Sequence, residues 1–478
     1  MVTLMVNDDD LTFFVEELRN SGLKATVHQI DNSILEKINK RVLAKIKSIK
    51  EISKNLNCSI GIVGGFVRDL LLENPSQDVD FIILKGNMQD LTQTIAEEMD
   101  GKVGKMSNQT LTTQIRFPDG TVFEFNETRK EAYEYPSRVP KVEKASLIED
   151  LNRRDFTINT FVLFGNKYID VFDGKRDLEN KILQTTREPS IVFKEDYLRM
   201  IRAIRFASKL DFSITEQVAE GIKEHADNLA EVPHERILNE LKTSLEFDSP
   251  KTFNLMKHLG IFVALFPEIP NIDLDINKSR FSNSWEKIEH KYDYLKEHNI
   301  KDSSVLLSVV FMELQVEDSF LYNEKSLEII KIEEIKNLLK RFTFSNKEIN
   351  EILLYVKHKD TILNLIDFQS SILEMRLFLR SVDPFLENLI LLTLAENETR
   401  ITPIEIETFI EKLRAMNSEK ELIHVVPKLD GNEIEKQFGF KDREIGEIKL
   451  ILTVAIMKEE IPNTKEACIE YIKEKLVQ

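Results

Sequence analysis

The sequence predicts an α/β head followed by an elongated, all-helical remainder made of a neck, a body and a tail. Nine of the 15 glycines lie between Gly61 and Gly174, where short runs rich in β-forming residues alternate with turns. Beyond about residue 186, Leu, Ile and Phe recur at helical spacing with few chain breakers. A chain of 478 residues is also too long for one compact core, so several domains are expected.

The expected elements follow in order along the chain. Residues 1–50 form an N-terminal helical extension, and a lysine-rich amphipathic helix over residues 33–56 leads into the first strand. Residues 51–185 form the head, whose strands are expected in GIVGGF, DVDFIIL, TTQIRF, TVFEF and KYIDVFDG. Helices then build a neck over 186–245, a body over 246–345 and a tail over 346–478.

Composition limits the classes to which the protein can belong. It carries 65 basic and 82 acidic side chains, a formal net charge of −17, so a nucleic-acid binder with this balance must concentrate its positive charge locally. This favours a compact RNA recognised by shape. Two distant cysteines, Cys58 and Cys468, exclude a disulfide framework and a cysteine zinc site. We find no signal peptide or membrane-spanning apolar run, and therefore expect a cytoplasmic protein without a membrane partner.

The most informative stretch is residues 61–84, which read GIVGGFVRDLLLENPSQDVDFIIL. Gly64 and Gly65 join an apolar strand to a helix, so backbone amides at this turn can approach a bound triphosphate. Asp78 and Asp80 lie two residues apart on the second strand, which puts both carboxylates on one face. Such a pair can hold two Mg2+ ions for phosphoryl or nucleotidyl transfer. Each feature alone is common in ordinary turns and strands, but their combination is far less so.

With Arg68 and Asp69 between them, these residues resemble the signature of the class II nucleotidyltransferases. This is the family of tRNA CCA-adding enzymes and bacterial poly(A) polymerases, and the resemblance extends over roughly residues 50–270. Residues 153–159, RRDFTIN, look like the second motif of that family. The resemblance implies that Arg154 and Asp155 contact the incoming nucleotide.

A third motif covers residues 195–214, EDYLRMIRAIRFASKLDFSI, and is similar to the segment that selects the base. The resemblance implies that Asp196 and Arg199 offer hydrogen bonds to C or A in place of a nucleic-acid template. Independently of the family, Asp196, Arg199, Arg202 and Arg205 are spaced every three residues, which forms a stripe on one side of a helix. A triphosphate would neutralise this stripe. The alternative is a solvated basic face, or ion pairs with acids elsewhere in the chain.

Further candidates carry less specific signals. Glu124, which alternates with Phe123 and Phe125, is expected on the same side as the aspartates, as a metal-adjacent carboxylate or base. Four residues resemble the flexible loop with which the family reorganises its pocket between C and A addition: Arg129, Glu131, Tyr133 and Pro136. Residues 234–241 resemble the segment that closes the family's neck, where Glu235 and Arg236 would orient the nucleotide-selecting pair. A plain ion pair at a helix start is the alternative.

The body and tail give weaker predictions. Residues 284–314 resemble a place where some relatives carry a metal-dependent HD phosphohydrolase domain. The His-Asp pair is replaced by Met312-Glu313, and His290 alone cannot hold a catalytic metal, so we expect a degenerate helical body. The tail is similar to the tail helices of long bacterial enzymes, but it lacks their Pro-Gly-Pro turn, having KDRE at residues 441–444.

The predicted activity is therefore metal-dependent transfer from CTP or ATP to the 3′ end of tRNA, with release of pyrophosphate. Asp78 and Asp80 would hold Mg2+. Residues expected to bind the nucleotide are Gly64, Gly65, Arg68, Arg154, Asp155, Asp196, Arg199, Arg202 and Arg205. The sequence leaves open full CCA addition, addition of A or of CC alone beside a partner enzyme, poly(A) synthesis, and a noncatalytic RNA-binding relative. It does not predict the oligomeric state.

Overall fold

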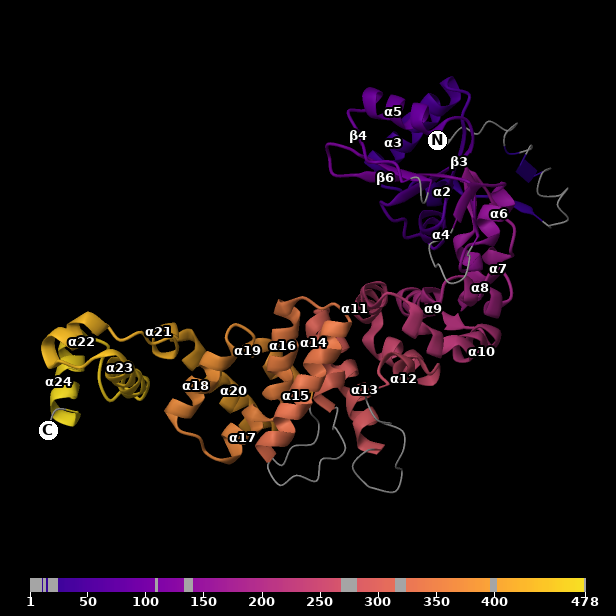
Figure 1. Ribbon diagram of the computed structural model, residues 1–478. Coiled ribbons are helices and arrows are strands. Elements are labelled where there is room, and N and C mark those ends of the chain that lie inside the picture. The colour runs from indigo at the N-terminus through magenta and orange to yellow at the C-terminus, as the bar shows by residue number, and fades with distance from the viewer. Residues whose placement is uncertain are drawn as a thin grey trace. The chain divides into compact units, whose positions relative to one another are not determined.

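The computed structural model describes residues 11, 14–15, 25–107, 111–132, 141–267, 282–313, 324–395 and 402–476 (Figure 1). The chain forms two compact units, Met1–Pro267 and Glu268–Gln478. The first begins with a mixed sheet and its helices and ends in helices, and the second is helical where it is described. The expected order, an α/β head followed by a mostly helical region, is confirmed. The division into neck, body and tail stays a prediction.

An eight-stranded sheet forms the frame of the head, in the order β1-β10-β9-β2-β3-β6-β5-β4. β2 (Ser59–Val63) runs antiparallel to β3 (Val79–Lys85), and β3 runs parallel to β6 (Val122–Glu127). The end of β2 and the starts of β3 and β6 therefore meet at one edge. The other strands are β1 (Thr26–Gln29), β4 (Lys102–Val103), β5 (Thr112–Arg116), β9 (Val162–Phe164) and β10 (Lys167–Asp170).

Alternation along the central strands divides their side chains between two cores. Phe81, Phe123 and Phe125 enter the core covered by α3 (Lys40–Asn55) and α5 (Met88–Glu98), helices that Figure 1 shows together beside the sheet. The rings of Phe81 and Phe125 stack with centroids 4.9 Å apart. Ile82 enters the second core, with α6 (Leu147–Asn152). Since successive strand residues point to opposite faces, Asp80 and Glu124 share the face of Ile82.

The N-terminal segment differs from the helical extension that the sequence predicted. β1 pairs antiparallel with β10 and adds an edge strand to the sheet. The helix expected over residues 33–56 is split into α2 (Asn32–Leu35) and α3, because Asn39 caps α3 by accepting a hydrogen bond from the Arg41 amide at 2.9 Å. Ile46 and Ile49 of α3 are fully buried in the head core, so this segment is part of the head.

Short elements connect the sheet to the helices that follow it. They are α4 (Gly65–Leu71), the hairpin β7 (Arg129–Ala132) and β8 (Lys141–Lys144), the 3-10 turn η1 (Thr157–Asn159), α7 (Gly174–Glu179), and the parallel pair β11 (Ile182–Leu183) and β12 (Ser213–Ile214). The helices are α8 (Pro189–Glu195), α9 (Leu198–Leu210), α10 (Glu216–His225), the 3-10 turn η2 (Ala226–Glu231), α11 (His234–His258) and α12 (Ile261–Leu265).

α11 packs along α9 and bends where Asp248 leaves the helical conformation, two residues before Pro250. Next to the bend, the hydroxyls of Ser208 and Ser244 each lie 2.8 Å from the Thr252 hydroxyl, inside the helix pair. This buried hydroxyl cluster fixes the two helices against each other.

Twelve helices are described in the second unit. They are α13 (Ser282–Glu297), α14 (Ser303–Glu313), α15 (Glu324–Arg341), α16 (Asn346–Lys357), α17 (Thr361–Asp367), α18 (Ile372–Val382), α19 (Leu386–Leu394), α20 (Pro403–Ser418), α21 (Lys420–Ile423), α22 (Gly431–Phe438), α23 (Asp442–Met457) and α24 (Lys465–Lys475). His290 is exposed on α13. Arg376 is buried and donates to the Met457 carbonyl at 2.5 Å and to Glu419 at 3.1 Å, which ties α18 to α23. Among the helices described, none is both long enough and apolar enough to cross a membrane.

Candidate active site

Two carboxylates meet at the sheet edge where β2 ends. Asp80 lies opposite Val63 of β2 on one side and opposite Glu124 of β6 on the other. The turn after β2 is Gly64, with a φ of 75°, a conformation that side chains strongly disfavour. A Cβ at Gly64 would lie 3.4 Å from an Asp80 carboxylate oxygen and 3.4 Å from the Arg154 guanidinium. A bare backbone thus faces the carboxylates.

Asp78 differs in position from the sequence prediction. β3 begins at Val79, so Asp78 lies just before the strand, and its side chain is exposed. It does not line the cavity that contains Asp80. Its charge still acts on Asp80: burial and the negative charge of Glu124 raise the pKa of Asp80 to about 6, with a further rise from Asp78 and an opposing effect from Arg154.

The donor set at this edge fits Mg2+. Asp80 and its neighbours supply carboxylate oxygens. Burial first, and then the negative charge of Glu124, raise the pKa of Asp80, and a bound cation would offset both effects. In the part of the chain that the structure describes, no group of three or more His, Cys, Asp or Glu side chains is arranged to hold a metal. Mg2+ is commonly held by one or two carboxylates together with substrate phosphates and water, so the two observations agree.

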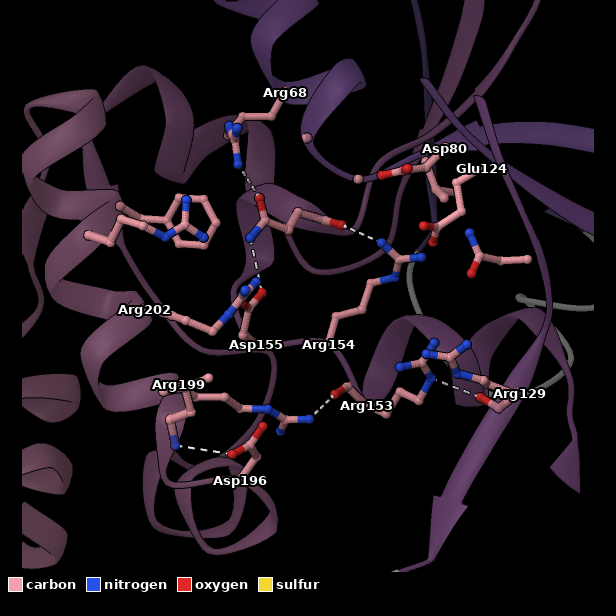
Figure 2. Close-up of a pocket in the computed structure, with 18 of the residues that line it drawn as sticks. Arg68, Asp80, Glu124, Arg129, Arg153, Arg154, Asp155, Asp196, Arg199 and Arg202 are labelled. Carbon is pink, nitrogen blue, oxygen red and sulfur yellow. Dashed lines mark hydrogen bonds and ion pairs between the residues drawn. The ribbon is translucent and has the colours of Figure 1, made fainter. Parts of the chain in front are cut away.

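The cavity in front of the carboxylates has a volume of about 480 Å³, within the range of small-molecule sites. Figure 2 shows its labelled side chains pointing inward from the sheet and from the helices that follow. Of the predicted site residues, all except Asp78 line this cavity: Gly64, Gly65, Arg68, Asp80, Glu124, Arg154, Asp155, Asp196, Arg199, Arg202 and Arg205. Arg236, which was predicted to orient the nucleotide-selecting pair, also lines it, as do three polar residues that were given no role: Asn126, Arg153 and Asn159.

A buried aspartate organises the first pair of arginines. Asp150 on α6 is 1% exposed and accepts hydrogen bonds from Arg153 at 2.7 Å and Arg154 at 3.2 Å. Arg154 also donates to the Asn159 carbonyl at 3.2 Å. Burial alone would raise the pKa of Asp150, but the positive charges of Arg154 and Arg153 outweigh this effect and lower the pKa. Asp150 therefore stays ionised and orients Arg154 beside Gly64.

The arginine stripe on α9 is paired with acids from other elements. Arg202 donates two hydrogen bonds to Asp155, at 2.9 and 2.7 Å, and Arg205 is bonded to Glu240 of α11. Burial would raise the pKa of Asp155. The positive charge of Arg202, and then the hydrogen bond from Asn159, lower it instead. The stripe is thus held by ion pairs with acids elsewhere in the chain, the alternative that the sequence left open. The guanidinium of Arg205 also lies 4.2 Å from the centroid of the Phe206 ring.

Asp196 and Arg199 are held by different partners. Asp196 accepts from the Leu198 amide at 3.1 Å and from Arg236 at 2.9 Å, so the Arg236 predicted to orient the pair does contact it. Arg199 donates to Glu195 at 2.9 Å, to the Val192 carbonyl at 3.1 Å and to the Arg153 carbonyl at 2.7 Å. Figure 2 shows both side chains at the lower wall of the cavity.

Arg187 supports Arg199 from behind, and the sequence analysis missed it. Its two terminal nitrogens donate to the two Glu195 oxygens at 2.8 and 2.6 Å, and its Nε donates to the Asn152 carbonyl at 2.8 Å. Glu195 is thereby clamped between Arg187 and Arg199. No local signal pointed to Arg187. Its partner, Glu195, lies eight residues away, and the ion pair between them forms only when α8 has folded.

Arg68 is almost fully buried beneath the turn. It donates to Asp69 at 2.8 Å and to the Asn159 side chain at 2.6 Å. Its guanidinium lies 5.0 Å from the centroid of the Phe206 ring. Of the predicted loop residues, Arg129 lines the cavity and Glu131 belongs to β7, whereas Tyr133 and Pro136 lie outside the described residues.

Two protein families match parts of this chain. The family described as Poly A polymerase head domain matches residues 60–184, and the family described as Probable RNA and SrmB-binding site of polymerase A matches residues 211–272. The A-adding tRNA nucleotidyltransferase of Geobacter sulfurreducens is 33% identical over 264 residues, which are 53% of this chain and 29% of that protein. The CCA-adding enzyme of Ligilactobacillus salivarius is 29% identical over 435 residues, 87% of this chain and 92% of that protein.

Coverage and structure add two further facts. The chain spans only 29% and 44% of the A-adding enzymes of Geobacter sulfurreducens and Aquifex aeolicus. A solved CCA-adding enzyme in an apo form matches this chain with a TM-score of 0.67 at 21% identity. The match covers 95% of this chain and 98% of the chain of that enzyme. The Thermotoga maritima CCA-adding enzyme complexed with tRNA has a TM-score of 0.64 at 20% identity, covering 94% of this chain and 99% of its own. These structures share the fold of this chain.

Proposed function

We propose that the chain, which is similar to the class II tRNA nucleotidyltransferases and poly(A) polymerases, adds C or A residues, or both, to the 3′ end of tRNA. One observation carries the proposal most directly. Asp80 and Glu124 lie side by side on β3 and β6, facing the Gly64 turn, in a cavity lined by arginines. Carboxylates, open backbone and guanidinium groups together suit a nucleoside triphosphate undergoing attack at phosphorus.

Each group at the site has a task in this reaction. Asp80 and Asp78 would hold Mg2+, which when bound neutralises the triphosphate and favours loss of pyrophosphate. Glu124 beside Asp80 would orient the attacking 3′ hydroxyl and accept its proton. The turn at Gly64 and Gly65 opens α4 and would offer backbone amides to the phosphates.

The side chains on the helical wall would bind and select the nucleotide. Arg154 lies against Gly64, where it would contact the phosphates, while Arg68, Arg202 and Arg205 would steady the nucleotide. Asp155 would act by holding Arg202. The Asp196 carboxylate accepts hydrogen bonds and the Arg199 guanidinium donates them, so together they would bind the hydrogen-bonding edge of the base. The pairing of Asp196 with Arg236 means that base reading would require this ion pair to rearrange or to share its oxygen.

The direct test supplies the purified chain with Mg2+ and tRNA transcripts that end at the discriminator base, at C or at CC. Each transcript is incubated with CTP, with ATP or with both, and products are resolved by one nucleotide. Addition of CCA followed by a stop would identify full CCA addition. Extension only from CC with ATP, or a stop after CC, would identify an A-adding or a CC-adding enzyme. A long A ladder would favour poly(A) synthesis, and no extension of any transcript would contradict the proposal.

Substitution of Asp78 tests the metal assignment separately. Asp78 is exposed and lies before the strand, so Asp78→Ala should leave the fold intact while nearly abolishing turnover, because one of two carboxylates for Mg2+ is lost. Far-ultraviolet circular dichroism would monitor the fold and single-nucleotide addition would monitor turnover. Asp119→Ala is a matched control at an aspartate that pairs with Lys45 on the surface. Near-normal turnover of Asp78→Ala would mean that this aspartate does not hold the metal.

A further inference from the structure

Asn126 presents an unused hydrogen-bond donor to the cavity. It lies two residues after Glu124 on β6, so both side chains project from the same face of the strand, about 7 Å apart along it. Asn126 is half-buried and lines the cavity with Glu124. The buried neighbours Phe123 and Phe125 fill the opposite face and hold the strand in place.

A short relay of hydrogen bonds fixes how the Asn126 amide is turned. Arg129 donates from Nη1 to the Thr112 hydroxyl at 3.0 Å, and a guanidinium can only donate. The Thr112 hydroxyl accepts this hydrogen bond and donates its own proton to Asn126 Oδ1, at 3.0 Å. The amide oxygen of Asn126 is occupied, and Nδ2 is left with two N–H groups. Among the described residues, Asn126 Nδ2 has no hydrogen-bond partner, so the relay holds a donor in readiness for a ligand.

The order of the strands indicates which substrate faces this donor. The phosphate-binding turn follows β2, Asp80 lies on β3, Glu124 lies on β6, and Thr112 lies on β5 at the far side. In an in-line displacement, the attacking oxygen and the leaving pyrophosphate lie on opposite sides of the reacting phosphorus. Pyrophosphate beside Gly64 then places the attacking hydroxyl on the β6 side. Asn126 lies on this side, beyond Glu124.

We propose that Asn126 binds the terminal ribose of the RNA primer by donating a hydrogen bond from Nδ2 to its 2′ hydroxyl. This inference rests on the proposed function. The 2′ hydroxyl is next to the attacking 3′ hydroxyl on the same sugar, and it is the group by which a protein distinguishes RNA from DNA. With the 3′ hydroxyl at Glu124, the neighbouring oxygen lies toward Asn126. Thr112 and Arg129 act as positioning residues that keep the amide in the donating orientation.

The test compares two primers on two proteins. A tRNA transcript that ends in a normal ribose and one that ends in a 2′-deoxyribose are extended by the wild-type protein and by Asn126→Ala, and kcat/KM for the primer is measured. Removal of either partner of one hydrogen bond should lower kcat/KM by about fivefold, and removal of both should cost no more than removal of one. The affinity for CTP or ATP without primer, measured by equilibrium binding, should not change.

Further variants keep the result interpretable. Thr112→Val removes the relay with little change in volume, and should reproduce part of the loss on the ribose primer and none on the deoxyribose primer. Asn228→Ala makes the same chemical change away from the cavity, where the amide bonds to Glu231, and should have no effect. If losses from Asn126→Ala and the deoxyribose primer multiply, the inference is wrong and the proposed function stands. If the wild-type protein extends neither primer, both are wrong.

Discussion

Replacement of Asp155 by Asn tests how the cavity wall is held together. Asp155 is buried, and its Oδ1 accepts from the Phe156 amide at 2.9 Å and from the Asn159 side chain at 3.0 Å. Its Oδ2 accepts two hydrogen bonds from Arg202. An asparagine has the same shape, but whichever way its amide turns, its NH2 group faces a donor. The substitution removes the charge and also leaves donors opposed inside the protein.

The expected loss of stability follows from these contacts. Removal of one partner from a buried ion pair costs about 3–5 kcal/mol. Arg202 is 33% exposed and keeps Glu240 at 3.4 Å, so the lower end of the range applies and we expect a loss of about 3 kcal/mol. Because the pKa of Asp155 is lowered in the folded protein, its stabilisation is fully present above the unfolded-state pKa of about 3.9 and is lost as pH falls through the folded-state value. The effect should be constant near neutral pH.

Hydrogen exchange followed by mass spectrometry is the suitable assay, because it reports on α9 itself in a chain that forms two units. Peptides from residues 198–210 should exchange in the variant with an opening free energy reduced by about 3 kcal/mol. Asp211→Asn is the matched control, since Asp211 pairs with Lys251 at 2.7 Å but is 83% exposed, and should cost less than about 1 kcal/mol. Equal exchange in the two variants would refute the reasoning.

Three other predictions use matched substitutions or pH. Gly64→Ala and Gly120→Ala each place a side chain at a positive φ, 75° and 86°. Only Gly64 has the carboxylate and guanidinium nearby, so only Gly64→Ala should weaken CTP or ATP binding in an equilibrium assay. Arg187→Ala should lower the selectivity for the correct nucleotide by roughly tenfold in single-addition kinetics, because Glu195 loses its clamp, whereas Arg176→Ala, at a surface pair, should not. Burial lowers the pKa of His358 to about 4, so α16 should lose stability as pH falls from about 6.5 toward 4, and proteolysis of His358→Gln should depend less on pH.

The head and its cavity could be predicted because their signals are local. The Gly64 turn and Asp80 are separated by one short helix, so the glycine and the carboxylate of the site can be recognised together in one short stretch of sequence. Glu124 followed from alternation with two phenylalanines, and the structure places it opposite Asp80. The roles assigned to these residues stay predictions.

The parts that could not be predicted depend on contacts distant along the chain. The stripe on α9 finds its acids at Asp155 and Glu240, 47 and 38 residues from Arg202, and no sequence spacing links them. β1 is four residues long, and this segment is a strand only because it pairs with β10. Asp78 was expected within the strand, but pairing with β6 begins at Val79 and pairing with β2 begins at Asp80. Alternation along the sequence does not reveal where pairing starts.

The eight arginines that line the cavity are already immobilised by other side chains of the protein. Seven of them are paired with carboxylates, and Arg129 is bonded to Thr112. Long side chains that become fixed on binding each cost about 0.5–1.5 kcal/mol in lost conformational entropy. Here most of that ordering takes place when the chain folds. In the proposed function, a nucleotide would therefore meet a largely ordered surface, in which the ion pair of Asp196 and Arg236 rearranges or shares its oxygen when the base is read.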